Sequence, residues 1–326
     1  MKHLINDPAQ AVREMLQGFA IANEATVELL IEQQAIVRRT ISKDHVALIS
    51  GGGSGHEPGH FGYVNENLLT AAVHGPVFVP PSKTQVLETI RHVDRGQGIL
   101  VIVKNFTADL DAFLPAVIQA KTEGIAVTHV IVDDDVSVAN DDSFERRRRG
   151  VAGTVLVHRI LGKAASEGQS LKELKALGER LIQSMSTLGV ALTPASVPGQ
   201  DAPLFELHDE EVYFGVGIHG EAGYRKAPMQ DSERIAVELV NKLKSRYRWK
   251  KRDRYVVLVN GLGGTTLMEQ YIFTNDVRQL LQLEGLEVSW AGTGNWLTSL
   301  NMRGISLTMM KVEDHEWLRL LGIASC

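Results

Sequence analysis

The chain has 326 residues, of which 44% are hydrophobic and 22% charged, and its net charge at pH 7 is −5. This length is typical of two domains, and the composition is that of a globular protein rather than a disordered or fibrous chain. The slightly acidic balance argues against a protein that binds nucleic acid or acidic membranes.

The single cysteine and the N-terminal segment indicate a cytoplasmic protein. Cys326 has no second cysteine to pair with, which fits a reducing compartment. The segment 1–8 lacks the apolar stretch of a signal peptide. The chain contains no apolar run approaching the roughly 20 residues that a membrane helix needs. We therefore expect no membrane span.

Strands and helices alternate in the first half of the chain. The spacing of Val12, Leu16 and Phe19 predicts a helix over 4–23. Ser170, with Glu173 three residues later, has the pattern of a capping box. This alternation favours a mainly parallel sheet covered by helices. We expect strands at 46–50, 71–73, 98–103 and 127–132, and further helices at 85–93, 109–121, 153–167 and 170–188.

A proline-rich segment separates these elements from a second set. Residues 193–203 hold three prolines, which indicates a loop and a domain transition. The predicted fold class is α/β, with two α/β domains at 1–192 and 193–326, each a mainly parallel or mixed sheet flanked by helices. In the second domain we expect strands at 211–218, 254–260, 286–291 and 305–311, and helices at 232–245 and 266–283.

A glycine-rich segment follows the first predicted strand. Residues 51–58 read Gly-Gly-Gly-Ser-Gly-His-Glu-Pro. Glycines lack the Cβ atoms that would hold a ligand away from the backbone. The segment has no Walker lysine, and His56 stands where a dinucleotide-binding fingerprint needs glycine. We therefore favour a loop that binds a small polar substrate over a nucleotide site or a purely structural turn.

Residues 104–109 bring several reactive groups to the end of the strand at 98–103. A lysine, an amide, a hydroxyl and a carboxylate lie within six residues. Asp109 could simply cap the following helix. It could also accept a proton from a substrate hydroxyl.

A second histidine with glycine neighbours, His219, lies in the segment 215–223 at another predicted strand end. Most lone histidines are structural, but this one repeats the pattern around His56, and a neutral imidazole is a nucleophile. A fourth loop, 260–266, is as well explained by a tight turn. The other histidines show no metal-ligand spacing, so we expect no metal in this chain.

A run of four arginines, 146–149, follows several aspartates. We interpret this segment as a solvated loop whose charges compensate one another. A site for an anion or an acidic partner is the alternative.

Taken together, these motifs resemble the dihydroxyacetone-binding K subunit of the bacterial dihydroxyacetone kinases along nearly the whole chain. The glycine-rich segment with His56 and the Gly-Ile-His-Gly-Glu segment with His219 are its most specific parts. The matching segments are 4–7, 47–58, 103–105, 148–155, 215–221, 259–263 and 298–300.

The resemblance implies a role for each matching residue. His219 would add to the ketone carbon of dihydroxyacetone and form a covalent hemiaminal. Asp109 would hydrogen-bond a terminal hydroxyl and accept its proton during phosphoryl transfer, and His56 would orient that hydroxyl. The remaining oxygens would be held by the backbone of Gly53, Ser54 and Gly55 and by the side chain of Lys104.

The resemblance also implies partners. The family's K subunit is a homodimer that holds no cofactor itself, and the nucleotide with Mg²⁺ resides on a separate L subunit. A class of paralogues keeps the ligand site but acts as a co-activator of a TetR-like transcription factor. The sequence leaves both roles open, since it departs from the kinase pattern at positions outside the three key residues. These departures are Gly59, Phe61, Phe106, Ala108, Ala222, the segment 81–84 and the tail 321–326.

Overall fold

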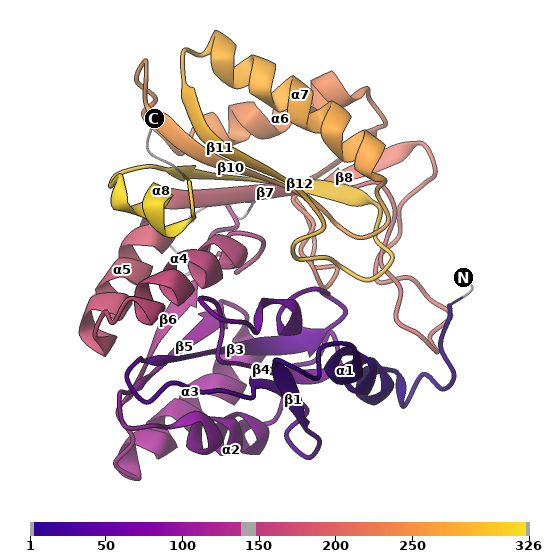
Figure 1. The fold of residues 1–326 in the computed structure, drawn as a ribbon. Helices are drawn as coiled ribbons and strands as arrows, with labels where there is room; N and C mark the ends of the chain where they lie inside the picture. The colour runs from indigo at the N-terminus through magenta and orange to yellow at the C-terminus, as the bar shows by residue number, and fades with distance from the viewer. Residues whose placement is uncertain (1–2, 138–147, 324–326) are drawn as a thin grey trace. The chain divides into compact units, whose positions relative to one another are not determined.

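The computed structural model describes residues 3–137 and 148–323. These residues form two α/β units, each built on a six-stranded sheet flanked by helices (Figure 1), which confirms the predicted fold class. Cys326 and the arginines 146 and 147 lie outside the described residues. Unit 1 comprises Met1–Val132, Val157–Arg180 and Val197–Asp201, and unit 2 comprises Asp133–Leu156, Leu181–Ser196 and Ala202–Cys326.

Unit 1 contains a mixed sheet with the strand order β1-β2-β4-β3-β5-β6. The four strands β4, β3, β5 and β6 are parallel to one another, while β1 and β2 form an antiparallel hairpin at one edge. The strands are β1 (Val27–Leu30), β2 (Ala35–Arg38), β3 (Ala47–Ser54), β4 (Ala71–Val77), β5 (Ile99–Lys104) and β6 (Val127–Val132).

The helices α2 (Lys83–Val93) and α3 (Thr107–Thr122) cover one face of this sheet (Figure 1). Alternate residues of β5, namely Ile99, Val101 and Val103, pack with them in one core. Every residue of β5 is buried, as expected for a parallel strand covered on both faces. The other helical elements of unit 1 are α1 (Ala11–Ala22), η1 (Phe61–Tyr63) and most of α4 (Thr154–Ser166) and α5 (Leu171–Ser184).

Several predicted elements of unit 1 differ in length from the structure, and the strand predicted at 71–73 extends to Val77. The first helix begins at Ala11 rather than at residue 4, and it follows the turn around Asp7 and Pro8. The first strand does not stop at residue 50 but continues through the glycines to Ser54, since these glycines pair with β4. The capping box between Ser170 and Glu173 is present as predicted.

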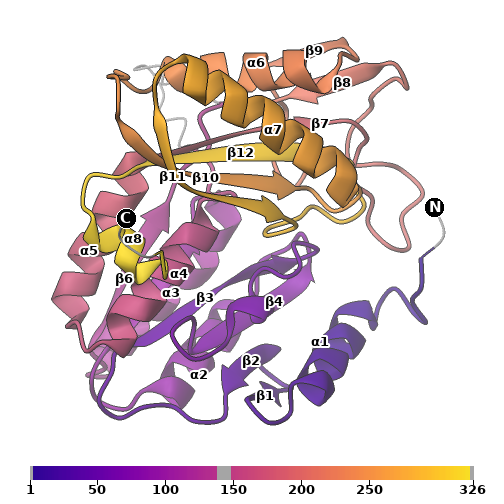
Figure 2. The same ribbon diagram turned by 45° about the horizontal axis from the view of Figure 1, so that its top comes forward.

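Unit 2 contains a sheet with the strand order β11-β10-β12-β7-β8-β9, in which only β10 and β11 are parallel. The helices α6 (Ser232–Lys244) and α7 (Leu267–Leu283) pack on one face of it (Figure 2), and α8 (Glu316–Leu320) follows β12. The strands are β7 (Met185–Ala191), β8 (Glu211–Phe214), β9 (Arg225–Pro228), β10 (Arg254–Gly261), β11 (Glu287–Gly294) and β12 (Gly304–Lys311).

The strand β7 was predicted as the end of a helix reaching residue 188. The helix α5 ends at Ser184 instead, and β7 pairs with β12 and β8 inside the second sheet. Tertiary pairing thus overrides a local helical pattern. As a result, β7 belongs to unit 2, whereas the expected domain limit at 192/193 assigns it to the first domain. None of the helices within the described residues is both long and apolar enough to cross a membrane.

Four histidines of unit 1, His56, His60, His74 and His158, have no exposed surface. Burial, with the nearby charge of Lys104, lowers the pKa of His158 from 6.5 to about 3. Burial also lowers the pKa of His74 to about 4. The unfolded chain therefore binds protons at these two histidines at a pH where the folded chain does not, and acid favours unfolding.

We predict that the free energy of unfolding falls as the pH drops from 7 to 5. The loss should be about 2 kcal/mol for each of His74 and His158, because their folded pKa values lie below the unfolded value. Guanidinium titrations of the wild type and His158→Gln at both pH values should show a smaller loss in the variant. His92→Gln, at a side chain that is 37% exposed, is the control. An equal loss in wild type and His158→Gln would contradict the prediction.

Candidate functional site

Lys104 and Asp109 lie together in unit 1, beside a glycine of β3. Lys104 ends β5, and Asp109 lies in the first turn of α3, which follows along the chain. Both are buried, at 0% and 3% exposure. A Cβ atom added to Gly52 would collide with Nζ of Lys104 and would lie 2.9 Å from Oδ1 of Asp109. The charged ends of both side chains therefore lie beside Gly52, and Nζ of Lys104 has no hydrogen-bond partner among the described residues.

Asp109 is not the residue that caps α3. The helix begins at Thr107, and its N-cap is Phe106, whose side chain makes no capping hydrogen bond. Asp109 is the third residue of the helix, so the simple capping interpretation is wrong. The helix dipole still stabilises a negative charge in the first turn. This placement suits a carboxylate that can accept a proton.

The glycines of β3 make room for another part of unit 1. A Cβ atom at Gly53 would meet the backbone of Phe78 and Val79, and one at Gly55 would meet the Phe78 ring. The missing Cβ atoms at these two positions therefore admit the segment of Phe78 and Val79. The hydroxyl of Ser54 donates to the carbonyl of Gly75 at 2.8 Å and helps to hold β3 against β4.

His56 follows β3 and is fully buried. Its ring centroid lies 5.2 Å from that of Phe78. Next to it, the carboxylate of Glu57 accepts a hydrogen bond from the amide of Gly55 at 2.8 Å. Burial raises the pKa of Glu57, against the effect of this hydrogen bond. The histidine predicted from the glycine-rich segment is thus held in an enclosed environment within unit 1.

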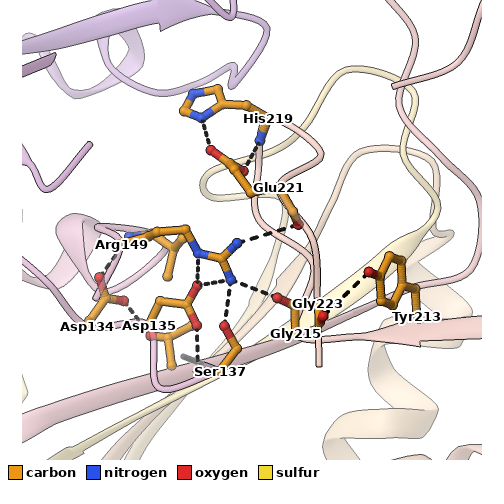
Figure 3. A network of polar contacts seen from close by, with 11 residues as sticks. Asp134, Asp135, Ser137, Arg149, Tyr213, Gly215, His219, Glu221 and Gly223 are labelled. Atoms are coloured by element: carbon orange, nitrogen blue, oxygen red, sulfur yellow. Dashed lines mark hydrogen bonds and ion pairs between the residues drawn. The ribbon is translucent and has the colours of Figure 1, made fainter. Parts of the chain in front are cut away.

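His219 lies in unit 2, in a tight loop that follows β8 (Figure 3). The strand ends at Phe214 rather than at residue 218, because Gly215 adopts a φ of +77° that favours glycine. Two hydrogen bonds close the loop: the amide of Gly217 donates to the carbonyl of Glu221 at 2.9 Å, and the amide of Gly220 donates to the carbonyl of Gly217 at 3.1 Å.

The carboxylate of Glu221 binds His219 at two points. One oxygen lies 2.8 Å from Nδ1 of the imidazole, and the other accepts the His219 amide at 3.0 Å (Figure 3). Burial opposes ionisation of this carboxyl group. The hydrogen bond and charge of His219, with a smaller contribution from Arg149, outweigh it and lower the pKa of Glu221 to about 2. An ionised Glu221 requires a proton on Nδ1, which makes Nε2 the basic and nucleophilic nitrogen of the neutral ring.

The predicted site residues therefore form one group in each unit. Gly53, Ser54, Gly55, His56, Lys104 and Asp109 belong to unit 1, and His219 belongs to unit 2. The sequence analysis missed the role of Glu221. Its position two residues after His219 was visible, but its contact with Nδ1 depends on the fold of the loop.

The fourth candidate loop is structural. The amide group of Asn260 is buried and is used completely within unit 2. It donates to the carbonyl of Leu297 and the hydroxyl of Ser306, and it accepts from the amides of Trp296 and Leu297. Among the described residues, no group of three or more histidine, cysteine or acidic side chains is arranged to hold a metal ion.

We predict that Gly52→Ala destabilises the protein by about 1–3 kcal/mol, because its Cβ would displace the buried ends of Lys104 and Asp109. Thermal and denaturant unfolding would measure the loss. Gly18→Ala is the matched control, since a Cβ there has no neighbour within 4 Å and Gly18 lies inside α1. This control should be stabilised by about 1 kcal/mol. Equal effects at the two positions would contradict the assignment of Gly52.

Comparisons with known proteins agree with these features. The model of the Dak1 domain matches residues 17–324. The chain is 48% identical over 320 residues to the DhaKLM operon coactivator DhaQ of Lactococcus lactis, covering 98% of this chain and 97% of that protein. It is 46% identical over 323 residues to the dihydroxyacetone-binding subunit DhaK of the PTS-dependent dihydroxyacetone kinase 1 of Listeria innocua, covering 99% and 98% of the two chains.

A solved structure titled as the dihydroxyacetone kinase operon co-activator Dha-DhaQ superposes with a TM-score of 0.90. It is 49% identical to this chain and covers 94% of both chains. Kinase subunits and a co-activator thus match this chain at nearly the same identity. The chain belongs to the Dak1 family, whose members include dihydroxyacetone-binding kinase subunits and operon co-activators.

Proposed function

We propose that this chain binds dihydroxyacetone covalently through Nε2 of His219. The observation that carries the proposal is the 2.8 Å contact between Nδ1 of His219 and the Glu221 carboxylate. In the neutral ring, this contact holds the proton on Nδ1 and leaves the lone pair on Nε2. The lone pair would attack the ketone carbon, the carbonyl π electrons would move to oxygen, and that oxygen would take up a proton from water, which leaves the ring positively charged. Glu221 would stabilise the positive charge that develops on the ring.

For the residues of unit 1 we propose the roles that the resemblance implies. Asp109 would accept the proton of a terminal hydroxyl, and His56 would orient that hydroxyl. Lys104 and the backbone of Gly53, Ser54 and Gly55 would hold the remaining oxygens. The buried charges of Lys104 and Asp109 suit this role, since each is worth more to a polar ligand away from water.

Covalent addition would give selectivity without a large binding surface. Dihydroxyacetone and glycerol have similar size and similar hydroxyl groups, but glycerol has no carbonyl group to attack. We therefore propose that the chain distinguishes ketone from alcohol by chemistry at His219.

The function that we favour is that of the dihydroxyacetone-binding subunit of a dihydroxyacetone kinase. The chain would present the substrate hydroxyl to a phosphoryl donor on a partner L subunit, which would carry nucleotide and Mg²⁺. We also propose that it is a cytoplasmic homodimer. The second candidate is a dihydroxyacetone sensor that binds the ligand in the same way and partners a TetR-like transcription factor. The 48% identity to DhaQ supports this alternative.

We predict that His219→Ala abolishes adduct formation. With dihydroxyacetone labelled with ¹³C at the ketone carbon, the wild type should convert the carbonyl resonance to that of a tetrahedral carbon. His219→Ala should leave only the free ligand signal, since no other group in this loop is proposed to attack. His208→Ala, at an exposed histidine of the same unit, should behave as the wild type. A tetrahedral signal in His219→Ala would refute the assignment.

The two candidate functions differ in their partner. As a kinase subunit, the chain mixed with an L subunit and its phosphoryl donor should form dihydroxyacetone phosphate, and Asp109→Asn should lower the rate by about 100-fold or more. As a co-activator, it should instead bind a TetR-like protein only with dihydroxyacetone present, and the adduct should still form. Product formation with a competent L subunit decides for the kinase.

A further inference from the structure

We propose that Arg149 and Asp135 form a positioning pair that holds the His219 loop in the conformation needed for attack on a ketone. This inference rests on the proposed function of His219. It concerns two residues to which the sequence analysis gave no role, because Arg149 was interpreted as part of a solvated basic run. That interpretation is wrong at Arg149, whose exposure is only 8%.

The pair is a buried ion pair within unit 2. Nη2 and Nε of Arg149 both lie near one carboxylate oxygen of Asp135, at 2.6 Å and 2.7 Å. Asp135 is 4% exposed, and its other oxygen accepts the amide of Ser137 at 2.9 Å. Because a buried guanidinium needs both a counter-charge and an acceptor for each N–H group, its remaining donors must also find partners.

Those remaining donors reach the His219 loop. Nη2 donates to the carbonyl of Gly215 at 2.7 Å and to the hydroxyl of Ser137 at 2.5 Å. Nη1 donates to the carbonyl of Glu221 at the longer distance of 3.5 Å. Gly215 begins the loop, and Glu221 lies near its end, so one planar group binds both sides of it (Figure 3). A lysine ammonium could not reproduce this fork of donors.

The chain of contacts leads from Arg149 to the reactive nitrogen. Arg149 contacts the main chain of Glu221, the Glu221 carboxylate binds Nδ1 of His219, and the proton on Nδ1 leaves Nε2 as the nucleophile. A separate bond, from the hydroxyl of Ser299 to the carbonyl of Ile218 at 2.6 Å, supports the middle of the loop. Arg149 therefore positions the imidazole without any proposed contact with the substrate.

The neighbouring residue Asp134 is a suitable comparison for Asp135, because its contacts support the fold of unit 2. It is as buried as Asp135, at 1% exposure. Its oxygens accept the amides of Val151 and Gly153 and the hydroxyl of Thr187, at 2.5–2.8 Å. These hydrogen bonds of the Asp134 carboxylate join the segment just before α4 and the strand β7. Asp134→Asn is therefore the matched control for a loss of stability alone.

The test compares Arg149→Lys, the double variant Arg149→Gln with Asp135→Asn, and Asp134→Asn in the full chain. The double variant removes both buried charges together, so it keeps the proposal testable if a single variant fails to fold. With ¹³C-labelled dihydroxyacetone, we expect the adduct population at a given ligand concentration to fall about 10- to 100-fold in Arg149→Lys and in the double variant. Asp134→Asn should form the adduct as the wild type does at a temperature where it is folded.

A second readout needs no ligand. The proton on Nδ1 of His219 should give a protected, downfield NMR signal in the wild type and in Asp134→Asn, and this signal should be lost in Arg149→Lys and in the double variant. If the wild type shows this signal but no adduct, the proposed function fails while the positioning role stands. Adduct formation and the Nδ1 signal at wild-type levels in the folded double variant would overturn the inference, because the pair would then serve stability alone.

Discussion

Buried charge that must be compensated inside the protein is the constraint that shapes the loop around His219. In unit 2, Arg149 lies away from water and needs an acceptor for each of its donors, so it binds Asp135, Ser137 and the carbonyl of Gly215. The loop that carries His219 therefore supplies one of the acceptors that the buried guanidinium needs. Its conformation is set by groups that are too costly to leave unpaired.

Unit 1 also buries charged groups. There, the charged ends of Lys104 and Asp109 both lie beside Gly52, where a larger residue would have no room. The parallel arrangement of β3 and β5 places the ends of these strands at one edge of the sheet. Such edges are where α/β proteins bind ligands. Buried histidines near Lys104 remain neutral, since burial and its charge disfavour their protonation.

Much of the architecture could be predicted from local patterns. The strand Val127–Val132 has the predicted limits. The helices α2, α3, α6 and α7 each begin and end within a few residues of the limits predicted for them. These elements carry strong signals, such as apolar runs and the capping residues Ser82 and Thr266. The strand β7 was missed because its pairing partners lie far away in the chain. The hairpin strands β1 and β2 were missed because each has only four residues.

Local patterns and short motifs, such as the one around His56, were enough to identify the α/β class, the family and the candidate residues, because they are recognised without knowledge of the fold. Tertiary structure alone decided that Asp109 is not a cap, that the glycines admit Phe78 and that Arg149 is buried. It also decided which nitrogen of His219 faces a carboxylate. Each of these features depends on residues that are distant in sequence or on the exact closure of a loop. Burial and contacts of this kind form only when the chain folds, because only then do residues that are distant in sequence come close enough to exclude water and to form hydrogen bonds with one another.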